Sequence, residues 1–331
     1  MLLVKTYEAE KIGGCITEVA SENTKIIFDY GKNLDDTPQI DIEGLTHGKP
    51  MYSAVFISHY HLDHIGGIDK ILKEIPIYVE ETTKKIYDVI CDFSSKPRIT
   101  VKTFKFNEEI EIGDLKVTPY KVDHSAYNSA MFVVTDSKEK VLYTGDFRNT
   151  GYTGKKLIPT LEKIGQVDYL ITEGTNIGNK SHILKNEESL VEEYAEIFKK
   201  YKQVFIMMSS SNIDRITTIQ KACNKAKHTF IQDLYMAHLT SLIHNEDKKA
   251  IPNPISYQDV MVYRPLYFKK KPQEFKDKYY DTFSSKNSSN MLRKPFVMDV
   301  RQSMIDDFKF VFKGKMNILD NACLIYSMWG G

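Results

Sequence analysis

A histidine-rich segment directly after an apolar run constrains this chain more than any other feature. From residue 58 to residue 67 it reads SHYHLDHIGG. The chain has nine histidines in 331 residues, so three within six positions are poorly explained by an ordinary exposed loop. Imidazole is the commonest protein ligand for zinc, and carboxylate is a compatible partner. The segment therefore predicts a metal site.

The residues around this segment predict how it is held. Residues 53–58 (SAVFIS) are typical of a short strand buried on both faces. On a loop leaving such a strand, His59 and His61 can project to one side and chelate one ion. Asp63 and His64 can then reach a second ion about 3.5–4 Å away, the usual separation in two-metal sites. We expect the glycines at 66 and 67 to let the chain turn sharply into a helix.

Two clusters further along follow other predicted strands. His124 comes after the strand expected at residues 115–120, and Asp146 after the strand expected at residues 140–143. Taken alone, each is better explained as a partly buried histidine or a turn residue. Together with the first segment, they add an imidazole and a bridging carboxylate at strand ends, where sites of layered sheet folds are assembled.

The second half of the chain has a different texture. From about residue 186, helical spacing at 188–201 and 213–226 alternates with an apolar run at 204–208, which predicts βα units and a parallel sheet. We expect a domain boundary near residues 175–185. The lysine-rich segment 268–294 is interpreted as a solvated excursion, with a basic lip that meets phosphates as the alternative.

A serine-rich turn precedes the helix predicted at 213–226. Ser210, Ser211 and Asn212 could offer hydroxyls and a helix N-terminus to an anion, and Arg215 could pair with phosphate. The alternative is an ordinary N-cap by Asn212 or Ser211.

Bulk properties exclude several classes of protein. The net charge is +1, so binding to nucleic acid would need a local basic patch. No apolar run approaches the roughly 20 residues that span a bilayer, and the first ten residues do not form a secretory signal. We therefore expect a cytoplasmic protein without membrane contact. The four cysteines form no C-x-x-C pair, so neither a thiolate zinc site nor a disulfide framework is expected.

These motifs together resemble a known family. The residues HYHLDH are similar to the HxHxDH motif of the metallo-β-lactamase superfamily, and Asp29-Tyr30-Gly31, Asp123-His124-Ser125 and Thr144-Gly145-Asp146 match its other motifs in order and spacing. Residues 172–176 and 207–216 resemble the β-CASP insertion of nucleases such as ribonuclease J. The resemblance implies an α/β (α+β) chain: an αββα metallo-β-lactamase sandwich at 1–180, an inserted α/β β-CASP-like domain at 181–318, and the start of a return to the first domain at 319–331.

The resemblance also implies roles for particular residues. His59, His61 and His124 would hold one Zn²⁺, and Asp63 and His64 the other, with Asp146 bridging; Mn²⁺ is the alternative metal. Asp63 would orient a metal-activated hydroxide that cleaves phosphodiesters of RNA, and Glu173 would fix a ligand imidazole from outside the metal's ligand shell. A homo-oligomer is left open.

The chain departs from the β-CASP pattern near its end. Those enzymes supply further histidines after the insertion, whereas this chain has none after His244, so the second metal position lacks one expected ligand. We interpret the chain as a shortened form of a longer enzyme. One alternative is that a partner chain or another residue supplies the ligand, with His182 and His238 as weak candidates. The other is that the protein binds one metal, or none tightly, and has lost activity. Two other functions stay open: hydrolysis of a small ester, thioester or lactone, and non-catalytic binding of nucleic acid after loss of the last ligands.

Overall fold

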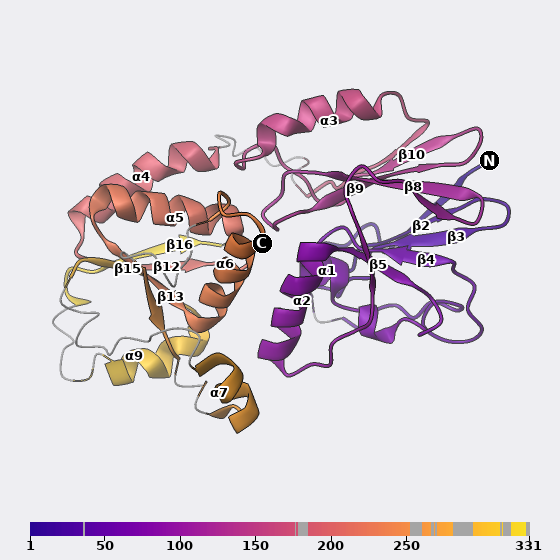
Figure 1. Ribbon diagram of the computed structural model, residues 1–331. Helices are drawn as coiled ribbons and strands as arrows, with labels where there is room; N and C mark the ends of the chain where they lie inside the picture. Colours follow the sequence, from indigo (N-terminus) through magenta and orange to yellow (C-terminus); the bar gives the residue numbers. More distant parts are fainter. Residues whose placement is uncertain are drawn as a thin grey trace. The chain divides into compact units, whose positions relative to one another are not determined.

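A computed structural model gives the fold of the protein as two compact units, Met1–Leu184 and Lys185–Gly331 (Figure 1). The structure describes residues 1–35, 37–175, 177, 185–251, 260–265, 268, 270–280, 294–311, 313 and 319–328.

The first unit contains two sheets. In one, β1 to β3 pair antiparallel and β3 to β6 pair parallel, in sequential order. Its strands are β1 (Leu3–Tyr7), β2 (Ile16–Ala20), β3 (Lys25–Phe28), β4 (Ala54–Phe56), β5 (Ile77–Glu80) and β6 (Lys102–Phe104). In the other, β7 to β10 pair antiparallel, and β11 joins β10 in parallel. Its strands are β7 (Ile110–Ile112), β8 (Leu115–Lys121), β9 (Ala130–Thr135), β10 (Lys140–Tyr143) and β11 (Tyr169–Ile171).

Helices cover the outer face of each sheet, which gives an αββα sandwich (Figure 1). Short α1 (Leu62–Ile65), the turn η1 (Ile68–Lys70) and α2 (Glu81–Ser94) lie on the first sheet; η2 (Gly154–Lys156) and α3 (Leu157–Ile164) lie on the second. Between the sheets, alternate apolar side chains meet in a core of aromatic rings. Phe28 stacks on Tyr143 with centroids 5.0 Å apart, so the strands that lead into the site are joined by buried rings.

The second unit is built on a wholly parallel sheet, with the strand order β14-β13-β15-β12-β16. Its strands are β12 (Gln203–Met208), β13 (Thr229–Asp233), β14 (Val260–Tyr263), β15 (Phe296–Asp299) and β16 (Cys323–Ser327). Its helical segments are α4 (Glu187–Lys200), α5 (Ile213–Ala226), α6 (Leu234–Glu246), α7 (Gln273–Tyr280), η4 (Gln302–Met304) and α9 (Ile305–Val311). In Figure 1, α4 and α5 lie on one face of this sheet and α9 on the other. Continuous apolar strands such as VFIM in β12 suit a sheet buried on both faces.

The predicted fold class is confirmed: the chain is an αββα sandwich followed by an α/β unit. The two compact units divide after residue 184, and the predicted domain bounds at 180–181 and 318–319 stay predictions. Residues 319–331 were expected to begin the return to the first domain, and the described strand in this range, β16, pairs with β12 of the second unit. Residues 281–293 of the predicted lysine-rich excursion lie outside the described residues, as does His182. No helix among those described has the length and apolar character needed to cross a membrane.

Candidate metal centre

The loop between β4 and α1 carries the histidine-rich segment, and close backbone packing fixes it. Tyr30 N–H donates to the carbonyl of His64, and Lys32 N–H donates to that of Leu62. Gly31 is needed between them, because a Cβ at this position would lie 1.5 Å from the carbonyl oxygen of Asp63. The loop after β3 and the first turn of α1 are therefore pressed together without room for a side chain.

The glycines at 66 and 67 lie between two short helical turns. Gly66 is the C-cap of α1 and Gly67 is the N-cap of η1, so Gly67 leads into a helical turn as expected. Neither has a positive φ. A Cβ at Gly67 would lie 1.7 Å from Nε2 of Gln39, so this glycine permits close packing.

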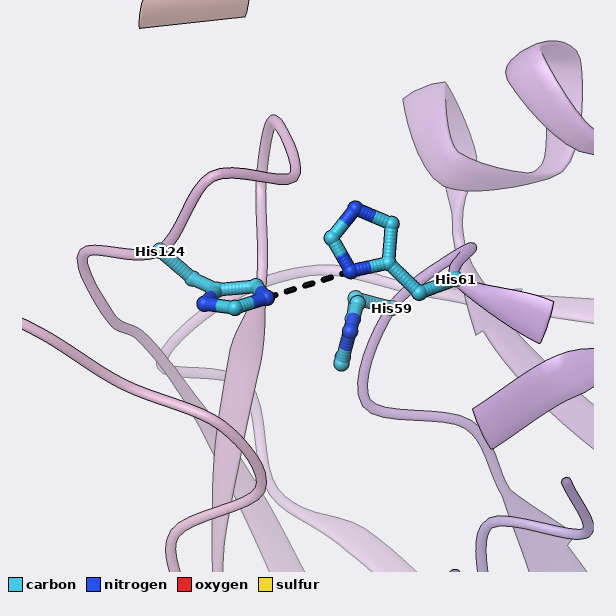
Figure 2. A group of neighbouring side chains, drawn as sticks. All are labelled: His59, His61 and His124. Atoms are coloured by element: carbon cyan, nitrogen blue, oxygen red, sulfur yellow. Dashed lines mark hydrogen bonds between the residues drawn. The ribbon is translucent and has the colours of Figure 1, made fainter. Parts of the chain in front are cut away.

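Three imidazoles from two distant segments converge beside this loop. Figure 2 shows His59 and His61 from the loop after β4 facing His124 from the loop after β8. Nε2 of His124 lies 3.2 Å from Nδ1 of His61. One ligand nitrogen from each of the three residues lies within 4.8 Å of the other two, which is the spacing that a single cation requires.

A second group shares His59 with the first. It consists of His59, His64 and Asp146, whose ligand atoms also lie within 4.8 Å of one another. One carboxylate oxygen of Asp146 is 3.3 Å from His64 Nε2, and the other is 3.8 Å from His124 Nε2. Asp146 therefore spans the two groups. Asp63 belongs to neither group, but its carboxylate lies 3.8 Å from His64 Nε2.

The buried carboxylate of Asp29 sets the orientation of His64. It accepts hydrogen bonds from Ser58 N–H (2.7 Å), Ser58 Oγ (2.8 Å), His64 Nδ1 (2.8 Å) and Tyr143 Oη (2.7 Å). With Nδ1 of His64 donating to Asp29, its Nε2 is directed at Asp146. Asp29 itself has a left-handed backbone, with φ +59°. The motif containing Asp29 was recognised from the sequence, but its hydrogen bonds and the role of Tyr143 were not.

Ser58 orients a second ligand. Its hydroxyl proton is donated to Asp29, so its oxygen can accept from Nδ1 of His59 at 2.9 Å. That arrangement places the ring proton of His59 on Nδ1 and leaves a lone pair on Nε2.

The electrostatics of the site favour neutral imidazoles at His59, His61 and His124, and a charged pair of His64 and Asp146. Burial, followed by the charges of neighbouring histidines, holds the pKa values of His59 and His124 well below the usual value. Burial likewise lowers the pKa of His61 to about 4. Burial opposes a charged His64, but the Asp29 carboxylate outweighs it and raises this pKa well above normal. Burial also disfavours the Asp146 anion, yet the His64 imidazole lowers the Asp146 pKa below normal.

Two further acids hold the loops that carry these ligands. Asp123, which is buried, accepts from Gly151 N–H (2.9 Å) and Thr153 Oγ1 (2.7 Å) and so fixes the loop after β10. Glu173 accepts from the backbone N–H of Phe147 at 2.9 Å, next to Asp146. The resemblance implies that Glu173 fixes a ligand imidazole; the hydrogen bond that Glu173 accepts holds the backbone beside the carboxylate of Asp146.

The donor set fits divalent cations. Among the described residues, Nε2 of His59 and Nε2 of His64 are buried without a hydrogen-bond partner. Buried polar nitrogens without partners are costly unless a ligand satisfies them. Both residues belong to the His59, His64 and Asp146 group, and mixed imidazole and carboxylate donors suit zinc or manganese.

The residues predicted to contact substrate lie at the start of α5, in the second unit. Asn212 is the N-cap of α5, and its side chain accepts from Arg215 N–H. The guanidinium of Arg215 forms an ion pair with Glu187 at 3.0 Å and bonds to Tyr194. Ser210 and Ser211 line a separate pocket of this unit. The N-cap alternative therefore describes Asn212, and Arg215 has an internal partner.

With this geometry in place, the fold and site define a metallo-hydrolase of the metallo-β-lactamase fold. The model of the β-lactamase superfamily domain matches residues 35–208, just over half of the chain. The chain belongs to this superfamily.

Several characterised proteins are similar to the chain over part of their length. RNase aCSPSF2 of Saccharolobus solfataricus is 29% identical over 193 residues, which cover 50% of this chain and 37% of that protein. The RNase J-like protein of Methanocaldococcus jannaschii is 26% identical over 227 residues, which cover 62% of this chain and 51% of that protein. The chain thus spans about half of one relative and little more than a third of the other.

A solved structure shares the fold over nearly the whole chain. The crystal structure of a protein of unknown function from Enterococcus faecalis aligns with a TM-score of 0.70 at 19% identity. The alignment covers 99% of this chain and 88% of that one. Both units of the present chain therefore occur together in a solved structure.

Proposed function

We propose that the chain is a metal-dependent phosphodiesterase that cleaves RNA. The observation that carries this proposal is the convergence of two ligand groups that share His59 and are spanned by Asp146. Two divalent cations held by such groups would acidify a water molecule and polarise a phosphoryl oxygen.

The residues of the chain prepare the site for that chemistry. The low pKa values of His59, His61 and His124 keep these imidazoles unprotonated at neutral pH, with lone pairs free for a metal. Asp29 holds the proton of His64 on Nδ1. Asp63 is 22% exposed and lines a pocket of about 360 Å³ together with His64 and Asp146. In our proposal it orients the nucleophile in this pocket and accepts its proton.

The proposed positioning role of Glu173 follows from its contact. By accepting from Phe147 N–H it fixes the backbone next to Asp146, and it lines the same pocket of the first unit. Burial raises the pKa of Glu173 above its usual value. Loss of this side chain should therefore loosen the bridging carboxylate and leave the imidazoles in place.

RNA is the proposed substrate because of the relatives. The names of the two characterised relatives are those of ribonucleases, and the cleavage and polyadenylation specificity factor 73 of Drosophila melanogaster is 24% identical over 231 residues. Cytoplasmic location and a homo-oligomeric state remain predictions from the sequence.

A cleavage assay with metal analysis tests the proposal. We expect the chain loaded with Zn²⁺ or Mn²⁺ to cut an end-labelled RNA, and Asp146→Asn to bind less metal and to lose cleavage. The exposed Asp41 provides a matched control, since Asp41→Asn makes the same change away from the site. Unchanged cleavage by Asp146→Asn would remove the two-metal mechanism. Hydrolysis of p-nitrophenyl esters without RNA cleavage would favour the small-molecule alternative, and a folded chain that binds RNA but no metal would favour the non-catalytic one.

A further inference from the structure

A second pocket of the first unit is lined by lysines. Its lining includes residues 120–123, which directly precede His124 in the sequence. It has a volume of about 140 Å³ and lies between the end of β8 and the start of α3. Lys121, Lys156 and Lys163 line it, with Tyr120 and the residues that lead into His124. The pocket therefore adjoins the loop that presents a proposed metal ligand.

The positive charge of this pocket is not cancelled by its acid. Asp123 is the acidic residue that lines the pocket, and it is buried and already accepts from Thr153 Oγ1 and Gly151 N–H. It also lies 3.6 Å from the guanidinium of Arg148. Lys163 donates to the neutral amide oxygen of Asn107 at 2.8 Å. Glu80 interacts electrostatically with Lys121, so the local excess of positive charge comes from Lys156 and Lys163, in a chain whose overall charge is nearly balanced.

Aromatic rings accompany two of these lysines. Lys163 Nζ lies 5.3 Å from the ring centroid of Tyr120, and Lys121 Nζ lies 4.9 Å from that of Tyr127. Both rings are half-buried and reach the surface. Proteins that bind single strands combine cations that follow the phosphate backbone with aromatic side chains that stack on bases. This pocket has lysines and one such ring, Tyr120, in its lining, and Tyr127 contacts the lining residue Lys121.

We infer that this lysine pocket is a phosphate subsite that holds the backbone of single-stranded RNA beside the metal centre, on the His124 side. The inference rests on the proposed function and names where that substrate is gripped. It also accounts for RNA binding by a chain with a net charge of +1, because the charge needed is concentrated locally.

The test removes charge at the pocket and leaves the metal ligands intact. Lys156→Ala/Lys163→Ala is compared with wild type for binding of a single-stranded RNA 20-mer across a range of salt concentrations. Each phosphate contact on a single strand contributes about −0.7 to the slope of log affinity against log salt. Because the double variant loses two such contacts, its slope should be shallower than that of wild type by about 1.4. Hydrolysis of bis(p-nitrophenyl) phosphate and metal content should not change.

Two further variants make the result specific. Lys102→Ala is the matched control, because Lys102 Nζ lies over the ring of Tyr78 at 5.4 Å on the other sheet. It should keep the wild-type slope. Lys156→Arg/Lys163→Arg keeps the charges and should restore the slope, which separates lost charge from lost folding.

The outcomes separate this inference from the proposed function. If wild type cleaves RNA but Lys156→Ala/Lys163→Ala keeps the full salt dependence, or Lys102→Ala loses as much, the subsite is refuted and the proposed function stands. If wild type neither binds nor cleaves RNA, the proposed function fails, and the subsite fails with it.

Discussion

The hydroxyl of Tyr143 offers a direct test of whether the hydrogen bonds around Asp29 prepare the metal centre. Tyr143→Phe removes one of the four donors to this carboxylate and keeps the ring that stacks on Phe28. A hydrogen bond to a charged acceptor is worth about 1.5–3 kcal/mol, and part of that is offset because a hydroxyl no longer has to be buried. We expect the free energy of unfolding to fall by about 1–2 kcal/mol, or about 2–8 °C in melting temperature for a unit of this size.

In free energy, the effect on metal binding should be of about the same size as the effect on stability. Residues that hold a metal ligand from outside change metal affinity by about 10–100-fold. Tyr143 acts on His64 through Asp29, so we expect the lower end of that range, about tenfold. Competition with a chromophoric chelator measures this affinity directly.

Tyr263→Phe is the matched control. The hydroxyl of Tyr263 donates to the carboxylate of Asp307 at 2.6 Å in the second unit, and neither residue belongs to the ligand groups of the metal centre. This variant should lose similar stability and keep its metal affinity. If Tyr143→Phe loses stability but binds metal as tightly as wild type, the carboxylate of Asp29 does not orient His64 and our account of the site is wrong.

Three other outcomes are expected. Burial and the charge of Asp233 raise the pKa of Asp299 well above normal. Because the folded state then holds this proton more tightly than the unfolded state, stability falls as pH rises above about 4. Asp299→Asn should therefore be more stable than wild type by about 1–3 kcal/mol at pH 8, with the melting curves converging near pH 4; a less stable variant at pH 8 would contradict this. Gly31→Ala would bring a Cβ within 1.5 Å of the carbonyl oxygen of Asp63, so metal content should drop and denaturant unfolding should show a loss above about 3 kcal/mol; full metal content would count against this close packing. Chelation should lower the melting temperature, reversibly on adding Zn²⁺, because a metal present at 100 times its dissociation constant stabilises by about 2.7 kcal/mol; identical curves with and without chelator would argue against a tightly held ion.

The sequence predicts the histidine loop well because the information is local. His59, His61 and His64 lie within one short segment after an apolar strand, and strand and loop can both be recognised from neighbouring residues. The alternation of apolar runs and helical spacing likewise predicts the parallel sheet of the second unit, whereas the αββα sandwich of the first unit is implied by the family resemblance. Adding His124 and Asp146 required weighing them together with the histidine segment, since each residue alone has an ordinary explanation, and the family resemblance then gave each residue its role.

Contacts between distant residues could not be predicted in this way. Arg215 is a plausible phosphate ligand by position, but its partner Glu187 lies 28 residues earlier and is one of 44 acidic residues in the chain. The acceptor role of Asp29 depends on Tyr143, which is 114 residues away and meets it only when the two sheets pack. Such pairings are set by packing of the sheets, and no periodicity in the sequence reports them.

The backbone of Asp29 has a consequence for which variants this position can tolerate. Its φ of +59° favours glycine, asparagine or aspartate, whereas its side chain must accept four hydrogen bonds. Asparagine suits the backbone but turns one acceptor into a donor, and glutamate keeps the charge but not the backbone preference. A saturation library at this codon should therefore return aspartate alone, because each single replacement violates one of two independent demands.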